Sequence, residues 1–287
     1  MTGKLYLCGT PIGNLEDITL RVIKVLKEAD LIAAEDTRQT LKLLNHIGIK
    51  KPMISYHEHN RFERGKQLID KLKQGLDIAL VTDAGMPGIS DPGEDIVKSC
   101  IDEGIEVIPV PGATASITAL VVSGFSTDKF VFEGFLPREN RERKIRINSL
   151  KNETRTTILY EAPHRIKSTL KELYLKLGNR RVAICRELTK KFEQIYRITL
   201  FEASTMYDDC KPRGEYVIVL EGKPMEEVIS EQRERWDDIS ISEHISMYVN
   251  QGMSKKDAMK RAAKDRGISK REVYRLSLDE QGNENRT

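Results

Sequence analysis

Short apolar runs alternate with segments of helical periodicity through the first 110 residues of the chain. The helical segments end at Gly48, Gly75 and Gly104, and glycine commonly follows the last turn of a helix. The first helix has Asp17 or Thr19 as its N-cap. This alternation predicts a largely parallel sheet covered by helices on both faces. The predicted strands are Lys4–Cys8, Leu31–Ala34, Met53–Tyr56, Asp77–Thr82 and Ile105–Val110.

A second series of apolar runs follows a break in the pattern at Pro109–Gly112. A helix is predicted over Pro163–Leu177, because proline is tolerated in a first helical turn. Fewer helical segments separate these strands, so we expect a mixed sheet. The predicted strands are Phe130–Phe135, Thr156–Glu161, Arg181–Arg186, Gln194–Leu200 and Tyr216–Glu221.

The pattern changes again after Gly222, where only helical segments are predicted. Ser254 and Ser269 are suitable N-caps for the last two helices, which together resemble a helix–turn–helix pair. We therefore expect an α/β protein with α/β domains at 1–112 and 113–224 and a small, basic helical domain at 225–287. The helices predicted in that last domain are Ser242–Asn250, Lys255–Asp265 and Lys270–Leu278.

Composition excludes several classes of protein. Of the 287 residues, 39% are hydrophobic, which is enough for a packed core, and no apolar run reaches the roughly 18 residues of a membrane span. The N-terminus lacks a signal-peptide pattern, and the four cysteines form no CxxC pair. A cytoplasmic protein without a membrane association is therefore expected. The net charge of +3 neither requires nor excludes an acidic partner.

Three loops rich in glycine and proline follow predicted strands, at the edge where open α/β sheets bind ligands. They are Gly9–Leu15, Val81–Gly93 and Val110–Ser116, and the first matches neither GxGxxG nor GxxxxGK[ST]. In the second loop, Asp83 is suited to bind a hydroxyl or ammonium group, while Asp91 could cap the helix entered through Pro92. The small side chains of the third loop leave room for a flat ligand, or else allow close helix–sheet packing.

Nine segments between Gly9 and Gly222 together resemble the class III, tetrapyrrole-methylase-like family of S-adenosylmethionine-dependent methyltransferases. They resemble most the branch of that family that 2′-O-methylates a cytidine in the ribosomal decoding centre, and the basic C-terminal region resembles the additional domain of that branch. The segments are GTPIGNLEDIT, AAEDTRQT, SYHEHN, VTDAGMPGISDPG, VPGATASITAL, FEGFLPR, YEAPHRI, RELTKKFE and GEYVIVLEG.

The resemblance implies a homodimer whose protomers each fold S-adenosyl-L-methionine into the cleft between two α/β domains. It implies 16S rRNA as the substrate, in the assembled small ribosomal subunit. Carried onto this sequence, the cofactor-binding residues are Pro11, Asp83, Gly85, Met86, Ile89, Thr114, Ala115, Tyr160, Glu161, Ala162 and Glu215.

Methyl transfer to a ribose 2′-hydroxyl needs alignment of the reacting groups and a group that accepts the hydroxyl proton. Two segments that follow first-domain strands carry suitable side chains, and our catalytic candidates are Glu35, Asp36, Arg38 and His57. Asp36 could instead only cap a helix, and Arg38 could only pair with a carboxylate. We expect no metal, because the His-Glu-His sequence at 57–59 lacks the spacing of an HExxH zinc site.

Two concentrations of positive charge favour an RNA partner, although solvated helix faces could also account for them. Residues 138–155 have a net charge of +4, and residues 253–278 one of +6. The RNA-binding candidates are Arg138, Arg141, Arg143, Lys144, His164, Arg165, Lys255, Lys256, Lys260, Lys264, Lys270 and Arg271.

Two other functions remain open at this point. One is a methylase of a tetrapyrrole precursor on the same scaffold, against which the basic tail and the AAEDTR and SYHEHN segments speak. The other is a non-catalytic RNA-binding assembly factor, against which the intact glycine-rich loops speak. The two are separated from the leading function by the acceptor of a labelled methyl group and by the binding of S-adenosylmethionine.

Overall fold

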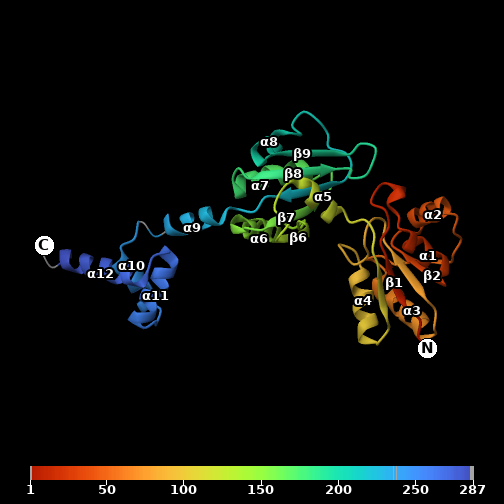
Figure 1. Cartoon of the computed structure of the whole chain (residues 1–287), viewed down its shortest axis with the longest axis horizontal. Helices are drawn as coiled ribbons and strands as arrows, with labels where there is room; N and C mark the ends of the chain where they lie inside the picture. Colours follow the sequence, from red (N-terminus) through yellow and green to blue (C-terminus); the bar gives the residue numbers. More distant parts are fainter. Residues whose placement is uncertain (1, 235, 237, 285–287) are drawn as a thin grey trace. The chain divides into compact units, whose positions relative to one another are not determined.

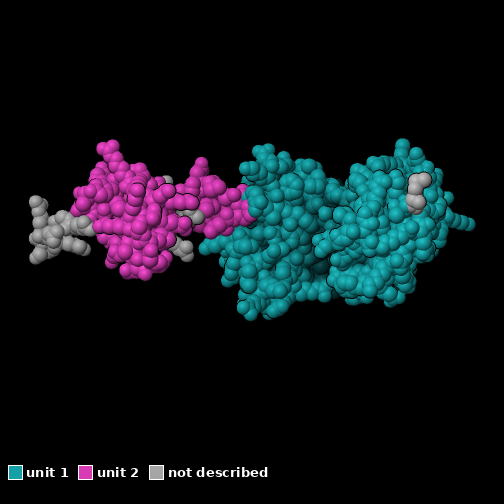
Figure 2. Space-filling view, turned by 90° about the horizontal axis from the view of Figure 1, so that it is seen from below, with its two compact units in different colours: residues 1–151, 155–221 teal, residues 152–154, 222–287 magenta. Residues whose placement is uncertain are grey.

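The computed structural model describes residues 2–234, 236 and 238–284, which form two compact units (Figures 1 and 2). Unit 1 comprises residues 1–151 and 155–221 and contains two β-sheets, whereas unit 2 comprises residues 152–154 and 222–287 and is helical. In the part of the chain that is described, every helix is too short or too polar to cross a lipid bilayer.

The first sheet has five parallel strands in the order β3-β2-β4-β1-β5, as the alternating pattern predicted. Successive residues of β4 point to opposite faces: Ile78 and Leu80 pack against α3 and α4, and Ala79 and Val81 against α1 and α2. The N-cap of α1 is Thr19 and not Asp17, since Thr19 accepts a hydrogen bond from the Val22 N–H. The elements are β1 (Leu5–Cys8), α1 (Leu20–Glu28), β2 (Leu31–Ala34), α2 (Thr37–His46), β3 (Met53–Ser55), α3 (Arg61–Lys73), β4 (Ile78–Val81), α4 (Gly93–Asp102) and β5 (Val107–Val110), with a 3-10 turn at Leu15–Asp17.

The second sheet is mixed, as expected, in the order β6-β7-β10-β8-β9. Only β6 and β7 pair in parallel, and the other neighbours are antiparallel. Helix α5 packs on one face through Ala119 and Leu120, and α6, α7 and α8 cover the other. The elements are α5 (Ala115–Ser123), β6 (Phe130–Phe135), α6 (Asn140–Ser149), β7 (Thr156–Glu161), α7 (Ile166–Leu177), β8 (Arg181–Arg186), β9 (Gln194–Thr199), α8 (Leu200–Thr205) and β10 (Tyr216–Leu220), with a 3-10 turn at Leu150–Asn152.

Several element boundaries differ from the prediction, and two of these differences have clear local reasons. Pro163 does not open α7: the Arg165 and Ile166 N–H groups both donate to the Ala162 carbonyl, so a turn precedes the helix. Leu200 does not end β9, because Thr199 and Glu202 form a capping box that begins α8 at that residue.

Unit 2 contains the three predicted helices, each slightly longer than expected, and one further helix before them. Ser254 accepts a hydrogen bond from the Asp257 N–H, and Ser269 accepts one from the Glu272 N–H, so both predicted N-caps are confirmed. The unit has its own small core around Ile245, a face of α11 rich in alanine, and Val273. The helices are α9 (Met225–Glu234), α10 (Ile241–Asn250), α11 (Lys255–Arg266) and α12 (Lys270–Glu284).

Candidate active site

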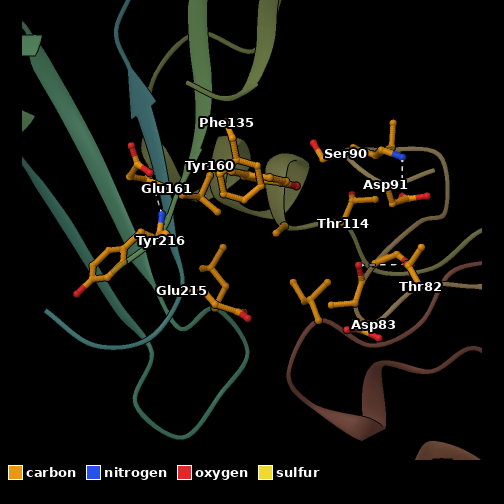
Figure 3. A pocket seen from close by; sticks show the side chains of 18 of the residues that line it. Thr82, Asp83, Ser90, Asp91, Thr114, Phe135, Tyr160, Glu161, Glu215 and Tyr216 are labelled. Atoms are coloured by element: carbon orange, nitrogen blue, oxygen red, sulfur yellow. Dashed lines mark hydrogen bonds between the residues drawn. The ribbon is translucent and has the colours of Figure 1, made fainter. Parts of the chain in front are cut away.

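A pocket of about 430 Å³ lies within unit 1, between the strand ends of its two sheets (Figure 3). This volume is in the range of pockets that hold small ligands and cofactors. One wall comes from loops that follow β1, β2, β4 and β5, and the other from the ends of β6, β7 and β8 and the beginning of β10. The lining residues are Ile12, Glu35, Thr82, Asp83, Ala84, Gly85, Met86, Ile89, Ser90, Asp91, Thr114, Ala115, Phe135, Tyr160, Glu161, Ala162, Pro163, Cys185, Leu188, Glu215, Tyr216 and Val217.

Close backbone contacts hold the loops of the first wall together. A Cβ atom on Gly112 would lie 2.6 Å from the Gly9 carbonyl oxygen, so these two positions approach each other only because both are glycine. Thr10 and Gly85 exchange backbone hydrogen bonds of 2.9 and 3.1 Å, which connect the β1 loop to the β4 loop. These backbone contacts hold the loops after β1, β4 and β5 together, and Gly85 of this group lines the pocket itself.

Asp91 gives the loop after β4 its shape. Its carboxylate accepts hydrogen bonds from the N–H groups of Gly88, Ile89 and Gly93 at 2.9, 3.0 and 2.7 Å. Gly93 is the first residue of α4 and Pro92 is its N-cap, so Asp91 lies one residue before the cap, and its carboxylate accepts a hydrogen bond from the first N–H of the helix. Ser90 has a φ of +64°, a conformation that costs energy in a residue with a side chain and that the three hydrogen bonds offset.

Two carboxylates, those of Glu35 and Asp83, line the pocket side by side at the ends of β2 and β4. The Asp83 N–H donates to Glu35 Oε2 at 3.3 Å, and the Asp36 N–H donates to Asp83 Oδ1 at 3.1 Å. Burial raises the pKa of Glu35, and the nearby charge of Asp83 raises it further. Burial also raises the pKa of Asp83, and this effect outweighs the hydrogen bond from the Asp36 N–H, which lowers it. Each group thus holds a proton more readily than an ordinary surface carboxylate.

Asp36 and Arg38 do not line the pocket. Asp36 caps α2 by accepting a hydrogen bond from the Arg38 N–H at 2.8 Å, and its other oxygen accepts one from the Arg38 guanidinium at 2.8 Å. This pairing lowers the pKa of Asp36 to about 2. Asp36 therefore caps a helix and Arg38 pairs with a carboxylate, as the two alternative interpretations stated. The lowered pKa leaves Asp36 unsuited to accept a proton at neutral pH.

His57 follows β3 on the same edge of the sheet but is not among the lining residues. Asn60 fixes it: the His57 N–H donates to Asn60 Oδ1 at 2.9 Å, and Asn60 Nδ2 lies 3.2 Å from His57 Nε2. The His59 ring lies 6.0 Å away, centroid to centroid. Among the described residues, no three His, Cys, Asp or Glu side chains are grouped as metal ligands.

Glu161 is the most deeply buried acidic group of the second wall, at 3% exposure. Its carboxylate accepts hydrogen bonds from the Thr169 hydroxyl at 2.5 Å and the Ala162 N–H at 2.9 Å, and it lies 3.4 Å from Arg165 Nε. These contacts make it a structural group of the wall. Glu215 is different: it is exposed at the pocket rim, where Lys190 Nζ donates to it at 2.8 Å.

The structure brings ten of the eleven cofactor candidates to this one pocket; Pro11 is buried and does not line it. Of the catalytic candidates, only Glu35 lines the pocket. Sequence reasoning found Tyr160 and Ala162 but missed the other apolar and aromatic members of the second wall, which are Phe135, Pro163, Cys185, Leu188, Tyr216 and Val217. For Phe135, the glycine before it at the end of a predicted strand was the available signal.

The candidate RNA-binding residues of unit 1 separate into two groups. Arg143 must be removed from the set: it is 7% exposed, and its guanidinium donates to Glu172 and to Thr169, both at 2.7 Å. Arg165 is half-buried, and its guanidinium donates to the Leu136 carbonyl at 2.7 Å. The exposed members are Arg138, Arg141, Lys144 and His164.

All six candidate residues in unit 2 are exposed. Lys256, Lys260 and Lys264 are spaced four residues apart along α11, so they share one helical face. The opposite side of α11 is buried in the unit core. The remaining three cations are Lys255, Lys270 and Arg271.

Comparisons with known proteins match this architecture. The family model described as Tetrapyrrole (Corrin/Porphyrin) Methylases matches residues 4–204. The chain is 51% identical over 274 residues to Ribosomal RNA small subunit methyltransferase I of Halalkalibacterium halodurans, which covers 96% of this chain and 94% of that protein. A protein of the same name from Thermotoga maritima is 50% identical over 221 residues, which are 99% of that protein but 77% of this chain. Among solved structures, uroporphyrin-III-C-methyltransferase from Thermus thermophilus has a TM-score of 0.55 at 19% identity, over 76% of this chain and 94% of that one.

Proposed function

Because the chain belongs to the tetrapyrrole methylase family, we propose that it is an S-adenosylmethionine-dependent methyltransferase of small-subunit ribosomal RNA. The proposed acceptor is the ribose 2′-hydroxyl of a cytidine in the decoding centre. The observation that carries the proposal is the 51% identity, over nearly the whole of both chains, to a relative named for this class of substrate. Methylation of a tetrapyrrole precursor has in its favour the family match and a fold similarity at 19% sequence identity, which is far below 51%.

The pocket fits the proposed cofactor in size and in chemistry. The loops after β4 and β5 offer backbone groups and small side chains at Gly85, Thr114 and Ala115, where an adenosine can lie close to the chain. The carboxylates of Glu35 and Asp83 are suited to hydroxyl and ammonium groups. When bound, the cofactor supplies a methyl group already activated by a sulfonium. The protein's remaining tasks are to align the acceptor and to receive its proton.

Glu35 is the group we assign to receive that proton. It lines the pocket, and its raised pKa brings it closer to the working pH, where a general base is most effective. Asp36 lacks this property because Arg38 holds its proton affinity low. His57 lies on the same edge, but its contacts are with Asn60. The assignment therefore follows from position and charge environment together.

Exposed cations of unit 1 and the basic face of α11 are assigned to the RNA phosphates, which such side chains neutralise in a salt-dependent way. We propose the assembled small ribosomal subunit as the substrate, in the cytoplasm, and a homodimer as the active form. The substrate assignment rests on the relatives' names, and the homodimer on the family resemblance.

The test is methyl transfer from labelled S-adenosylmethionine to small ribosomal subunits that lack decoding-centre modifications, with the modified nucleotide mapped by mass spectrometry. A 2′-O-methyl group on a decoding-centre cytidine supports both reaction and substrate. Transfer to a base, or to another RNA region, would overturn the finer assignment but keep the enzyme class. Cofactor binding without transfer to any rRNA would overturn the substrate class.

A second experiment tests the role of Glu35. Glu35→Gln preserves the size of the side chain and removes the base, so kcat should fall by about a hundredfold or more, the usual contribution of a general base. The wild-type rate should rise with pH through the raised pKa of Glu35, and the variant should lose that dependence. Glu63→Gln, an exposed carboxylate of α3, is the control. An active Glu35→Gln variant with an unchanged pH profile would assign the base elsewhere.

A further inference from the structure

A β-bulge re-aims one aromatic side chain at the mouth of the pocket. In the pairing of β6 with β7, Phe132 lies opposite Ile158 and Gly134 opposite Leu159, so Glu133 is an extra residue. Gly134 has a φ of +64°, which glycine adopts without strain. Bulges of this kind often redirect a side chain beside an active site. Glu133 itself is paired with Arg146 Nε of α6 at 2.9 Å.

As a result, Phe132 and Phe135 both contact the same tyrosine, although residues three apart in a regular strand point to opposite faces. Their ring centroids lie 4.9 and 5.6 Å from that of Tyr160, both edge to face. The Tyr160 hydroxyl oxygen accepts a hydrogen bond from the Ser116 N–H at 3.1 Å, which fixes the middle ring. The three aromatic side chains thus form one supported wall, with Phe135 outermost.

Phe135 is 53% exposed, although it lines the pocket. Ile89, on the loop after β4, also lines the pocket and is 48% exposed. The loop after β4 approaches the end of β6 here, since a Cβ atom on Gly134 would lie 3.5 Å from Ser90 Oγ. Figure 3 shows Phe135 above Tyr160, with Ser90 and Asp91 on the other side of the pocket. An apolar ring face and an apolar side chain are therefore left uncovered at the pocket mouth.

We propose that Phe135 is the platform on which the base of the acceptor nucleotide stacks. This inference rests on the proposed function and names the contact that specifies its substrate. RNA-binding proteins commonly hold an unstacked base against an aromatic ring. The Arg165 guanidinium holds the chain just after the ring, through the Leu136 and Pro137 carbonyls at 2.7 and 3.2 Å, so the platform is fixed in place.

Two planar groups could stack on the Phe135 ring: the base of the acceptor RNA and the adenine of the cofactor. We assign the acceptor because the Phe135 ring is 53% exposed at the pocket mouth, whereas the small residues proposed to hold the adenosine, Gly85, Thr114 and Ala115, belong to the opposite wall. The two sources predict opposite kinetic signatures. Loss of a platform for the acceptor raises KM for RNA, whereas loss of an adenine contact raises Kd for S-adenosylmethionine.

The experiment compares Phe135→Ala, Phe135→Leu and Phe135→Tyr in the full-length protein. Removing a stacked ring should raise KM for small ribosomal subunits by about tenfold or more in the Ala and Leu variants. The Tyr variant should keep wild-type values, and Kd for S-adenosylmethionine by calorimetry should be unchanged in all three. Phe201→Ala is the matched control, because Phe201 is also 53% exposed and also lies 5.6 Å from a tyrosine ring, but outside the pocket.

A binding measurement keeps this test separate from that of the proposed function. A short single-stranded RNA with pyrrolocytosine at the acceptor position should lose fluorescence on binding the wild-type protein and lose much less with Phe135→Leu. If the wild-type protein transfers no methyl group to RNA, the proposed function fails. The difference in quenching between the wild type and Phe135→Leu still shows whether a base stacks on Phe135. Equal quenching by both proteins, or a tenfold rise in Kd for S-adenosylmethionine in Phe135→Ala with KM unchanged, would overturn the proposal.

Discussion

The substitution Gly112→Ala tests whether close contact between two backbones shapes the pocket. The added Cβ would lie 2.6 Å from the Gly9 carbonyl oxygen, whereas ordinary contact begins at 3.4 Å, so the loops would have to separate by about 0.8 Å. The nearest atoms are all backbone atoms of Gly9 and cannot rotate away. The Gly9 N–H also donates to the Val110 carbonyl at 3.0 Å, which ties the two strand ends together.

The cost follows from this geometry. Overpacking by one carbon in a site that cannot relax typically destabilises by about 1–3 kcal/mol. For a unit of this size, each kcal/mol lowers Tm by about 2–4 °C, so unit 1 should unfold about 2–12 °C earlier. Thr114 and Ala115 lie two and three residues after Gly112 and line the pocket. Their displacement should raise Kd for S-adenosylmethionine by about tenfold, which corresponds to 1.4 kcal/mol.

Thermal unfolding and calorimetric titration with S-adenosylmethionine measure the two effects separately. Gly65→Ala is the control, because a Cβ at this position in α3 meets only the Tyr56 ring, at 3.9 Å, and alanine favours a helix over glycine by up to about 1 kcal/mol. It should raise Tm slightly and leave Kd unchanged. A Gly112→Ala protein with wild-type Tm and wild-type Kd would refute the reasoning about this contact.

Three further predictions concern other parts of the chain. Asp83→Ala should weaken cofactor binding about tenfold, and Asp83→Asn less, because an amide oxygen still accepts the hydrogen bond from Asp36; unchanged calorimetric Kd values would remove Asp83 from the site. Deletion of 225–287 should leave that Kd unchanged but lower the affinity for rRNA and its salt dependence in a filter-binding assay; a folded truncation that binds no cofactor would contradict this. Burial, then the Arg266 charge, lowers the pKa of His244, so the unfolded chain binds the proton more readily and unit 2 should lose stability as pH falls below about 6.5. Trp236, the only tryptophan, stacks on His244 with a ring-centroid distance of 3.7 Å, so its fluorescence reports the unfolding of unit 2. The control is His46→Gln, at an exposed histidine, which should not change the pH dependence of stability. A wild-type stability that does not depend on pH would contradict this role of His244.

The sheets could be predicted from the sequence because most strands are short apolar runs, and two of them, β1 and β5, are followed directly by Gly9 and Pro111. The apolar pattern did not predict helices α5 and α6. Helix α6 has no apolar stripe, since Arg143 and Ile147 are its only buried residues. Helix α5 is apolar on nearly every side and rich in β-branched residues, so its pattern favours no helical face. Tertiary packing, and not periodicity, determines both.

The candidate site shows the same division. The glycine-rich loops at strand ends could be recognised in the sequence, because glycine and proline themselves indicate the backbone conformations that such loops need. The roles of charged residues were not, because they depend on partners distant in sequence: Arg143 is neutralised by Glu172, which lies 29 positions away. A run of arginines along a helix therefore overstates the positive surface when one of them faces the core, as Arg143 does on α6. The pairing of Asp36 with Arg38 is local, which is why capping could be weighed from the sequence.

The position of the pocket carboxylates is a property of sheet register more than of the loops themselves. Glu35 and Asp83 are each held by a backbone N–H at the end of the neighbouring strand. The last pair between β2 and β4 is Ala34 with Val81, one residue before Glu35 and two before Asp83. A shift of one residue between these strands would move both carboxylates out of the pocket. The aromatic wall, in contrast, depends on an irregularity, the bulge at Glu133. The first sheet thus provides charge through regular pairing, and the second provides a stacking surface through a local departure from it.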